Sequence, residues 1–291
     1  MSGRVARLPG MQIAALRPLR RCALPALAPM LARAHPFAGD EDIAFDEPSH
    51  TYTVRGKRVP ISVTKLGSQA VPPEHRFDGR KVVLKNLRSW TVNMSSKYHP
   101  MVVGVDEEQA VANVLASWDK NRDAGTAMHK CFEQHLNQEP VDRAEECADE
   151  MAQFHVAMDN LLGLTPARTE MSIFANDAHG DAAVAGQIDL LMKDKEGGLH
   201  IVDFKRTAND LTPGATSYGK RFLSNLPLND HYKYSLQLAM YALMFQLQTG
   251  EPILSMRLMQ VHPSLDAARI VQTTDMSEHA RNLLEGAGVV F

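Results

Sequence analysis

Apolar and polar positions alternate with a period of two over His50–Leu66, and β-branched residues flank an Arg-Gly-Lys step near its centre. Such alternation places successive side chains on opposite faces of a strand, and the glycine favours a tight turn. The pattern therefore predicts a hairpin that runs into a helix beginning near Ser62 or Thr64. Residues 77–98 show no regular period, and we expect an irregular segment there.

Helical spacing replaces this alternation from Asp106 onwards. Apolar residues at helical spacing predict three helices, at Asp106–Lys120, Gly125–Asn137 and Asp142–Gly163. Apolar, β-branched runs then predict three strands, at Ala167–Phe174, Val184–Met192 and Leu199–Lys205. The sequence Lys-Asp-Lys-Glu-Gly-Gly between the last two is typical of a hairpin connection, so these strands should pair antiparallel.

The remaining pattern predicts a long helix at Asp230–Thr249, a strand at Ile253–Val261 and a final helix near Ser277–Glu285. This order of elements favours one α/β domain in which helices pack on a mixed sheet. A content of 44% hydrophobic and 22% charged residues is ordinary for a soluble globular protein. No apolar run reaches about 18 residues, so no membrane span is expected.

The three cysteines, Cys22, Cys131 and Cys147, are odd in number and share no C-x-x-C spacing. This argues against a disulfide framework, a four-cysteine zinc site and a four-cysteine iron–sulfur cluster. We interpret them as buried thiols in a reducing compartment.

Charge is distributed unevenly along the chain. Residues 1–39 contain no Asp or Glu but hold six arginines: Arg4, Arg7, Arg17, Arg20, Arg21 and Arg33. An Arg-rich, acid-poor segment is typical of an organellar transit peptide. We expect residues 1–39 to be a disordered leader for import into the mitochondrial matrix, and residues 40–291 to form a single domain. A basic arm on a protein that is not imported is the alternative.

Removal of those six arginines would take the formal net charge from −3 to −9, so any polyanion must bind at a local basic strip. An insertion at about residues 50–100 contains such a strip, in which basic and aromatic residues mingle: Arg76, Arg80, Lys81, Lys85, Arg88, Trp90, Lys97 and Tyr98. Cations can follow the phosphates of a single strand while rings stack on its bases. A solvated loop is the alternative interpretation.

Three charged residues interrupt the two paired strands: Asp189, Asp203 and Lys205, within GQIDLLMKDKEGGLHIVDFKR. Side chains alternate along a strand, so Asp203 and Lys205 should share one face while Val202 and Phe204 face the other way. Two converging carboxylates are costly to desolvate unless a cation lies between them. Mg²⁺, with the Phe204 carbonyl as a further ligand, suits this arrangement, and Lys205 would then lie beside the water that attacks a phosphate.

Two helical pairs place further polar groups at four-residue spacing. His129 and Glu133 share one helix face, and Gln237 and Tyr241 share a face of the long helix. Imidazole is a ligand for Mn²⁺ and is tolerated beside Mg²⁺. Structural alternatives exist, because His129 could be a half-buried histidine and Tyr241 a core residue. The acid–acid–lysine pattern alone also occurs by chance in many chains.

Taken in order, GTAMH, Glu170 at the start of a strand, GQIDLL, IVDFK and QLAMY resemble the motifs of RecB-like nucleases of the PD-(D/E)XK superfamily. HTYTVRGKRVPISVT resembles, more loosely, the N-terminal hairpin and helix of phage exonucleases and of mitochondrial genome maintenance exonucleases. The resemblance covers about residues 50–260. It implies a restriction-endonuclease-like core, with a mixed β-sheet flanked by helices.

The resemblance also implies roles for individual residues. The implied metal ligands are His129, Asp189, Asp203 and the Phe204 carbonyl, with Glu170 as a further acid for a second metal. Lys205 would be the catalytic lysine, and Gln237 and Tyr241 would orient that lysine or the phosphate. Arg206 replaces the Thr or Ser expected after the lysine, which would change the phosphate contact. A cysteine cluster of the kind that some relatives use to clamp their ends is absent from the sequence.

These expectations converge on a deoxyribonuclease that depends on Mg²⁺ or Mn²⁺. We expect a monomeric exonuclease that acts on single-stranded DNA or DNA ends in mitochondrial DNA maintenance, through repair or replication. The first alternative is a non-catalytic nucleic-acid-binding or scaffold protein that retains a nuclease fold. The second is a metal-dependent hydrolase of another phosphate ester, although the basic strip favours a polymer.

Overall fold

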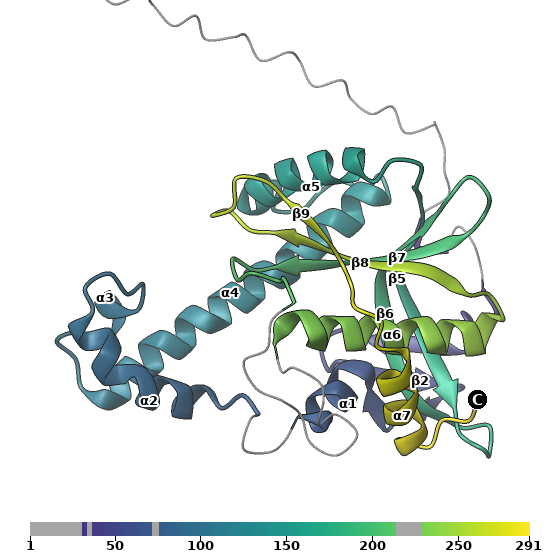
Figure 1. The fold of residues 1–291 in the computed structure, drawn as a ribbon, viewed down its shortest axis with the longest axis horizontal. Coiled ribbons are helices and arrows are strands. Elements are labelled where there is room, and N and C mark those ends of the chain that lie inside the picture. The colour runs from purple at the N-terminus through teal and green to yellow at the C-terminus, as the bar shows by residue number, and fades with distance from the viewer. Residues whose placement is uncertain (1–30, 34–36, 72–75, 214–228) are drawn as a thin grey trace, which may run out of the picture.

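The computed structural model describes residues 31–33, 37–71, 76–213 and 229–291 (Figure 1). A small antiparallel sheet contains β1 (Ile43–Asp46), β2 (Thr51–Val54) and β3 (Lys57–Arg58). A larger mixed sheet contains β4 (Ile61–Ser62), β5 (Thr165–Asn176), β6 (Ala182–Lys193), β7 (Leu199–Arg206), β8 (Ile253–Val261) and β9 (Arg269–Gln272). The predicted mixed α/β fold is therefore confirmed.

Strand β6 is the centre of the larger sheet. β5 pairs with it antiparallel along one edge. Its other edge pairs in parallel with β4 at Val184 and Ala185, and antiparallel with β7 from Leu190 to Lys193. β8 then lies parallel to β7, and β9 lies antiparallel to β8. Within the described residues, this second edge of β6 has no strand partner over residues 186–189.

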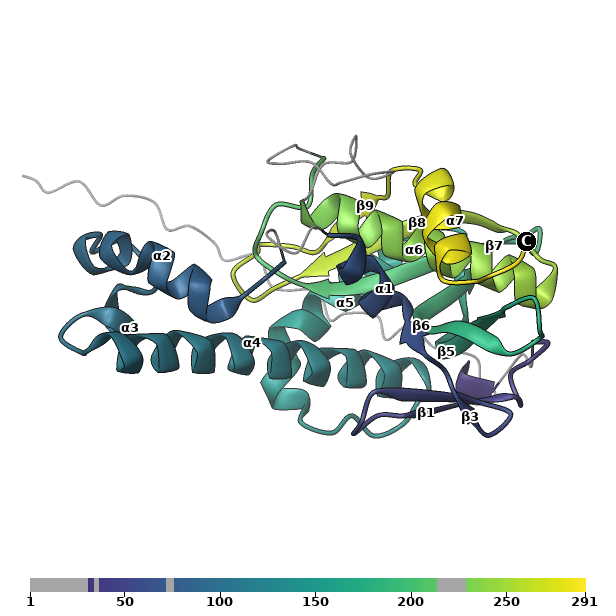
Figure 2. The same ribbon diagram turned by 90° about the horizontal axis from the view of Figure 1, so that it is seen from below.

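Helices cover both faces of the larger sheet (Figures 1 and 2). One face packs against α1 (Val63–Ala70), α6 (Asp230–Thr249) and α7 (Ser277–Gly286). The other packs against the C-terminal half of α4 (Glu107–Leu136) and against α5 (Ala148–Asn160). Because side chains alternate along a strand, Ile201 joins the first core while its neighbour Val202 joins the second.

A helical arm projects from this body and consists of α2 (Gly79–Val92), α3 (His99–Val102) and the first half of α4 (Figure 2). It has its own apolar cluster, made of Val83, Val102, Ala110, Val111 and Val114. Trp90 and Tyr98 pack on this cluster with ring centroids 4.2 Å apart. The prediction of an irregular segment at residues 77–98 is wrong over Gly79–Val92, where α2 forms because Val83 and its apolar neighbours pack against α4, a partner that the local pattern does not show.

Most other predicted elements are confirmed. α6 and β8 have the predicted bounds, and α1 begins where expected because Ser62 Oγ accepts the backbone N–H of Lys65. The two helices predicted between residues 106 and 137 are one helix, α4, which continues through Gly125. The short elements β1, α3 and β9 were not predicted, nor were two 3₁₀ turns, η1 (Leu31–Arg33) and η3 (Ala144–Cys147).

Cys131 and Cys147 form a disulfide between α4 and η3. Both side chains are buried, as predicted, but their interpretation as thiols is wrong, because the chain reverses direction between them and brings the two side chains together. Cys22 lies outside the described residues.

Most of the expected leader, residues 1–30 and 34–36, also lies outside the described residues. The parts that are described pack on the domain: Ala32 N–H donates to Asn137 Oδ1 at 3.0 Å, and the Phe37 ring lies 5.3 Å from that of Phe245. Among the helices of the described residues, none has the length and apolar character needed to cross a membrane.

Candidate active site

Strands β6 and β7 separate at the position of the predicted acids. Their backbone pairing ends at Leu190 and Val202, and beyond this point Asp189 Oδ2 accepts the backbone N–H of Phe204 at 2.8 Å. A carboxylate therefore satisfies a donor that a ladder carbonyl would otherwise have taken. The predicted alternation on β7 is also present, because Val202 and Phe204 lie in the core while Asp203 and Lys205 line a cleft.

Glu170 lies beside Asp189 on β5 with an unusual backbone conformation. Its neighbours Thr169 and Met171 pair with the residues on either side of Asp189. Its φ angle is 44°, in the left-handed region that is unfavourable for residues other than glycine. The Gln187 side chain donates to the Glu170 carbonyl at 3.2 Å and so supports this conformation. Backbone strain of this kind is often found at functional sites, and here it coincides with the meeting of two acids.

His129, Glu170 and Asp189 form a candidate metal site, because one ligand atom from each lies within 4.8 Å of the others. His129 Nδ1 is 3.5 Å from Asp189 Oδ2. Burial and the charge of Lys205 lower the pKa of His129 to about 4, so its imidazole is neutral at pH 7, as a metal ligand must be. Burial raises the pKa of Glu170 well above its usual value, and Asp189 raises it further.

These observations fit a divalent cation. Burial raises the pKa of both carboxyl groups in spite of Lys205 and Lys130 nearby, and a bound cation would stabilise their charged forms. Two oxygen donors and one neutral imidazole are suitable ligands for Mg²⁺ or Mn²⁺.

Asp203, predicted as a metal ligand, pairs with Lys205 and is not part of the candidate metal site, whereas Glu170, predicted as an acid for a second metal, lies in it with His129 and Asp189. Asp203 Oδ2 lies 2.5 Å from Lys205 Nζ, and the Asp203 side chain is 3% exposed. Burial raises the pKa of Asp203 to about 6, against the opposing charge of Lys205. Burial lowers the pKa of Lys205, but Asp203 and Asp189 outweigh it and the net value is about 12. Lys205 is therefore a cation at pH 7.

Gln237 and Tyr241 lie together on α6, as their spacing predicted. Gln237 Nε2 donates to the Tyr241 hydroxyl oxygen at 2.9 Å and to Thr64 Oγ1 at 3.4 Å. Burial raises the pKa of Tyr241, and the charge of Asp203 adds to this effect. Because the hydroxyl accepts from Gln237, its own hydrogen is available to an acceptor in the cleft.

The residues described above line one cleft of about 460 Å³. The same cleft is lined by three rings from the small sheet that the sequence analysis did not identify: Phe45, His50 and Tyr52. Burial, followed by the charges of Glu170 and Asp189, raises the pKa of Tyr52 to about 12, which places Tyr52 in the field of these acids. The alternation in this segment predicted a strand face, but no local signal shows which part of the domain that face meets.

The predicted basic strip lies on and beside the arm, and its side chains do not line this cleft. Arg80 Nη1 donates to Glu108 Oε2 at 2.7 Å, and Arg76 donates to backbone carbonyls of Gln69 and Val71. Three cations of α2 are exposed: Lys81, Lys85 and Arg88. Trp90 is half-buried against Tyr98, so its ring contributes to the core of the arm.

Arg206 is also engaged within the protein. Its Nε lies 2.7 Å from Glu150 Oε1, and the two side chains are 14% and 3% exposed. The charge of Arg206 is therefore matched by a buried carboxylate.

Residues 154–287 match the family model described as "PD-(D/E)XK nuclease superfamily". The solved structure of SSO0001 is similar at 16% identity and a TM-score of 0.27, covering 56% of this chain and 72% of that chain. A "putative exonuclease" from Eubacterium rectale is similar at 13% identity and a TM-score of 0.31, covering 75% of this chain and 82% of that chain. No curated protein matches this chain. The family match spans the cleft residues of β5, β6, β7 and α6, while His129 lies before it.

Proposed function

We propose that this chain, in which residues 154–287 match the family model of the PD-(D/E)XK nuclease superfamily, is a divalent-metal-dependent deoxyribonuclease, and specifically an exonuclease for single-stranded DNA. The observation that supports this most directly is the meeting of His129, Glu170 and Asp189 beside the cationic Lys205. An anionic phosphodiester would be drawn to a cation held by these three residues and to Lys205 itself.

The cleft residues would have separate roles in binding the cation and in stabilising the phosphate. His129, Glu170 and Asp189 would hold the cation, which when bound supplies Lewis-acid stabilisation of the phosphate and makes a water more acidic. Lys205 would stabilise the negative charge that develops on the phosphate, since its raised pKa keeps it protonated and unsuited to act as a base. Asp203 would hold Lys205 in place through their ion pair.

Tyr241 and Gln237 would orient the substrate. The Tyr241 hydroxyl accepts from Gln237, so it can donate its hydrogen to a phosphate oxygen in the cleft. Gln237 also contacts Thr64 and thereby connects this pair to the start of α1.

Cleavage assays with the full chain test the proposal. End-labelled linear single-stranded DNA should be degraded with Mg²⁺ or Mn²⁺ and protected by a chelator, whereas circular single strands and RNA should persist. Asp189→Asn should abolish degradation because it removes a ligand that also anchors Phe204. Asp119→Asn, at an exposed acid of α4, is the matched control and should cleave normally.

Three results would contradict parts of this proposal. Linear DNA that stays intact with both metals rejects the nuclease itself. Chelator-insensitive binding without cleavage favours the non-catalytic alternative. Cleavage of circles indicates an endonuclease.

We also propose import into the mitochondrial matrix, supported by the Arg-rich, acid-poor composition of residues 1–39. Imaging of the full chain fused at its C-terminus to a fluorescent protein tests this. Replacement of the six arginines by glutamine should abolish mitochondrial targeting, and unchanged targeting would contradict the proposal.

A further inference from the structure

Three rings of the small sheet form a continuous stack on one wall of the cleft. Phe45 and Tyr52 are direct cross-strand partners on β1 and β2, with ring centroids 4.6 Å apart and planes inclined by 29°. His50, in the turn between these strands, stacks with the same Phe45 ring at 5.7 Å and the same inclination, so Phe45 is the central ring. We call Phe45, His50 and Tyr52 the ring stack.

The ring stack and the candidate metal site share the same cleft. Phe45 and Tyr52 are only half-buried and His50 is exposed, so none of the three rings is fully covered by the domain's cores. Tyr52 is close enough to Glu170 and Asp189 to feel their charges. A substrate held at the candidate metal site would therefore lie beside the ring stack.

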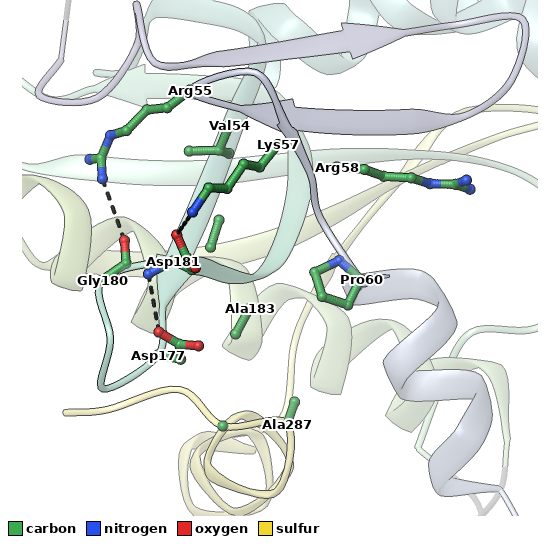
Figure 3. Close-up of a pocket in the computed structure, with 12 residues that line it drawn as sticks. Val54, Arg55, Lys57, Arg58, Pro60, Asp177, Gly180, Asp181, Ala183 and Ala287 are labelled. Carbon is green, nitrogen blue, oxygen red and sulfur yellow. Dashed lines mark hydrogen bonds and ion pairs between the residues drawn. The ribbon is translucent and has the colours of Figure 1, made fainter.

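The small sheet is fixed on the larger one by contacts at its other end (Figure 3). Lys57 Nζ lies 2.6 Å from Asp181 Oδ1 just before β6, and Arg55 donates to the Gly180 carbonyl at 3.4 Å. Val54 also packs on Phe174 of β5 and Ala185 of β6. The stack is thus held at a set position relative to β6, the strand that carries Asp189.

The chemistry of the wall favours a planar, neutral group beside a phosphate. The cleft also contains Glu47 and Glu170, which repel phosphates wherever no cation compensates them, and Glu133, which is paired with Lys130 at 2.8 Å. A phosphodiester would therefore be held at the candidate metal site and Lys205, while the adjoining rings offer π-faces on which bases stack without regard to sequence. Bases within a duplex already stack on their neighbours, so only an unpaired base can use such a surface.

We propose that the ring stack is a base-stacking subsite that holds unpaired nucleobases of a single-stranded polynucleotide next to the metal site. This inference rests on the proposed nuclease function and gives it a physical source of preference for single strands. It assigns Phe45, His50 and Tyr52 as substrate-positioning residues, whereas the candidate metal site and Lys205 act on the phosphate.

Binding to two labelled 12-mers tests the proposal: a thymidine strand and an abasic strand with the same phosphates, both in Ca²⁺ to limit cleavage. Fluorescence anisotropy of the full chain should show tighter binding of the thymidine strand. Phe45→Leu removes the central ring, which holds His50 and Tyr52 in the stack, and should weaken that binding about 10-fold, the equivalent of about 1.4 kcal/mol for one lost ring–base contact. It should change abasic binding less than about twofold. Phe291→Leu, outside the cleft, is the matched control and should change neither.

A second variant guards against a folding defect, because Phe45 also contributes to the small sheet. His50 has a φ angle of 47° and an exposed side chain, and asparagine tolerates this backbone region while removing the ring. His50→Asn should keep the melting temperature and still lose affinity for the thymidine strand alone.

The outcomes separate the two proposals. Equal losses on both strands, or no loss in either variant, overturn the ring stack as a base subsite, and normal cleavage by the unmodified chain then leaves the nuclease proposal standing. Conversely, base-dependent binding that is lost in Phe45→Leu, combined with no cleavage in Mg²⁺ or Mn²⁺, rejects the nuclease and keeps the subsite. An unmodified chain that binds neither strand overturns the ring-stack proposal.

Discussion

Gly186 of β6 has no room for a side chain, and Gly186→Ala should therefore disturb the cleft. A Cβ atom there would lie 2.5 Å from Tyr241 Cε1 and 3.0 Å from Val63 Cγ2, where ordinary contacts begin at 3.4 Å. The Tyr241 ring would have to move by about 1 Å. This movement is opposed by its surroundings, because Tyr241 is only 5% exposed and its hydroxyl is hydrogen-bonded to Gln237. Overpacking of this kind costs about 1–3 kcal/mol.

Urea unfolding measures this cost, and each kcal/mol should also lower the melting temperature by about 2–4 °C. Because the displaced ring carries the hydroxyl proposed to orient the phosphate, DNA cleavage should fall as well. Gly186→Ala should cost less when Tyr241 is already alanine, since the atoms that clash are then absent. Gly286→Ala, where a Cβ meets nothing within 4 Å, is the control and should leave stability and cleavage close to normal.

An unfolding free energy within about 0.5 kcal/mol of the unmodified chain would refute the predicted clash. An equal cost in the Tyr241→Ala background would show that the strain falls elsewhere, for example on Val63.

Three further predictions concern the charges of the site and its surroundings. The folded state raises the pKa of Asp203 to about 6, so the stability that the folded state gains from protonated Asp203 is complete below about pH 4 and is lost as the pH rises through 6. In the presence of a chelator, melting scans should therefore show Asp203→Asn gaining stability relative to the unmodified chain between pH 4 and pH 7. A difference that does not depend on pH would contradict this. Mn²⁺ at 100 times its Kd should raise the unfolding free energy by about 2.7 kcal/mol. Melting scans of Asp189→Asn should no longer show this gain. An equal gain in the variant would place the metal elsewhere. Glu150→Ala should lower the free energy of unfolding in urea by about 3–5 kcal/mol, because it leaves the guanidinium of Arg206 without its carboxylate partner. The double replacement Glu150→Leu/Arg206→Met should lower it much less. Equal losses would show that the ion pair is not the cause.

Most of the helices and strands, and the strand face on which Asp203 and Lys205 lie, could be predicted from the sequence. Period and capping located α1, α6 and β8, because these depend on neighbouring residues. Strand alternation correctly assigned Asp203 and Lys205 to one face and Phe204 to the other. The pattern failed at α2, whose apolar face becomes intelligible only when α4 lies beside it.

Tertiary structure decided which residues meet. The opening of the sheet beside β6 depends on the registers of three strands, and local periodicity does not encode how far each pairing extends. Glu170 joins His129 and Asp189 because its strand aligns it there, whereas Lys205 neutralises Asp203. The ring stack enters the cleft because the small sheet is bonded to Asp181 and Gly180, more than a hundred residues away in sequence.

The sequence by itself thus determined the chemical groups and the faces on which they lie, since both follow from covalent order and local geometry. Only the folded chain determined which acids lie close enough to share a cation, which arginines are already paired and which rings border the cleft. Those outcomes depend on distances between segments remote in sequence, and such distances are set by the packing of the whole domain.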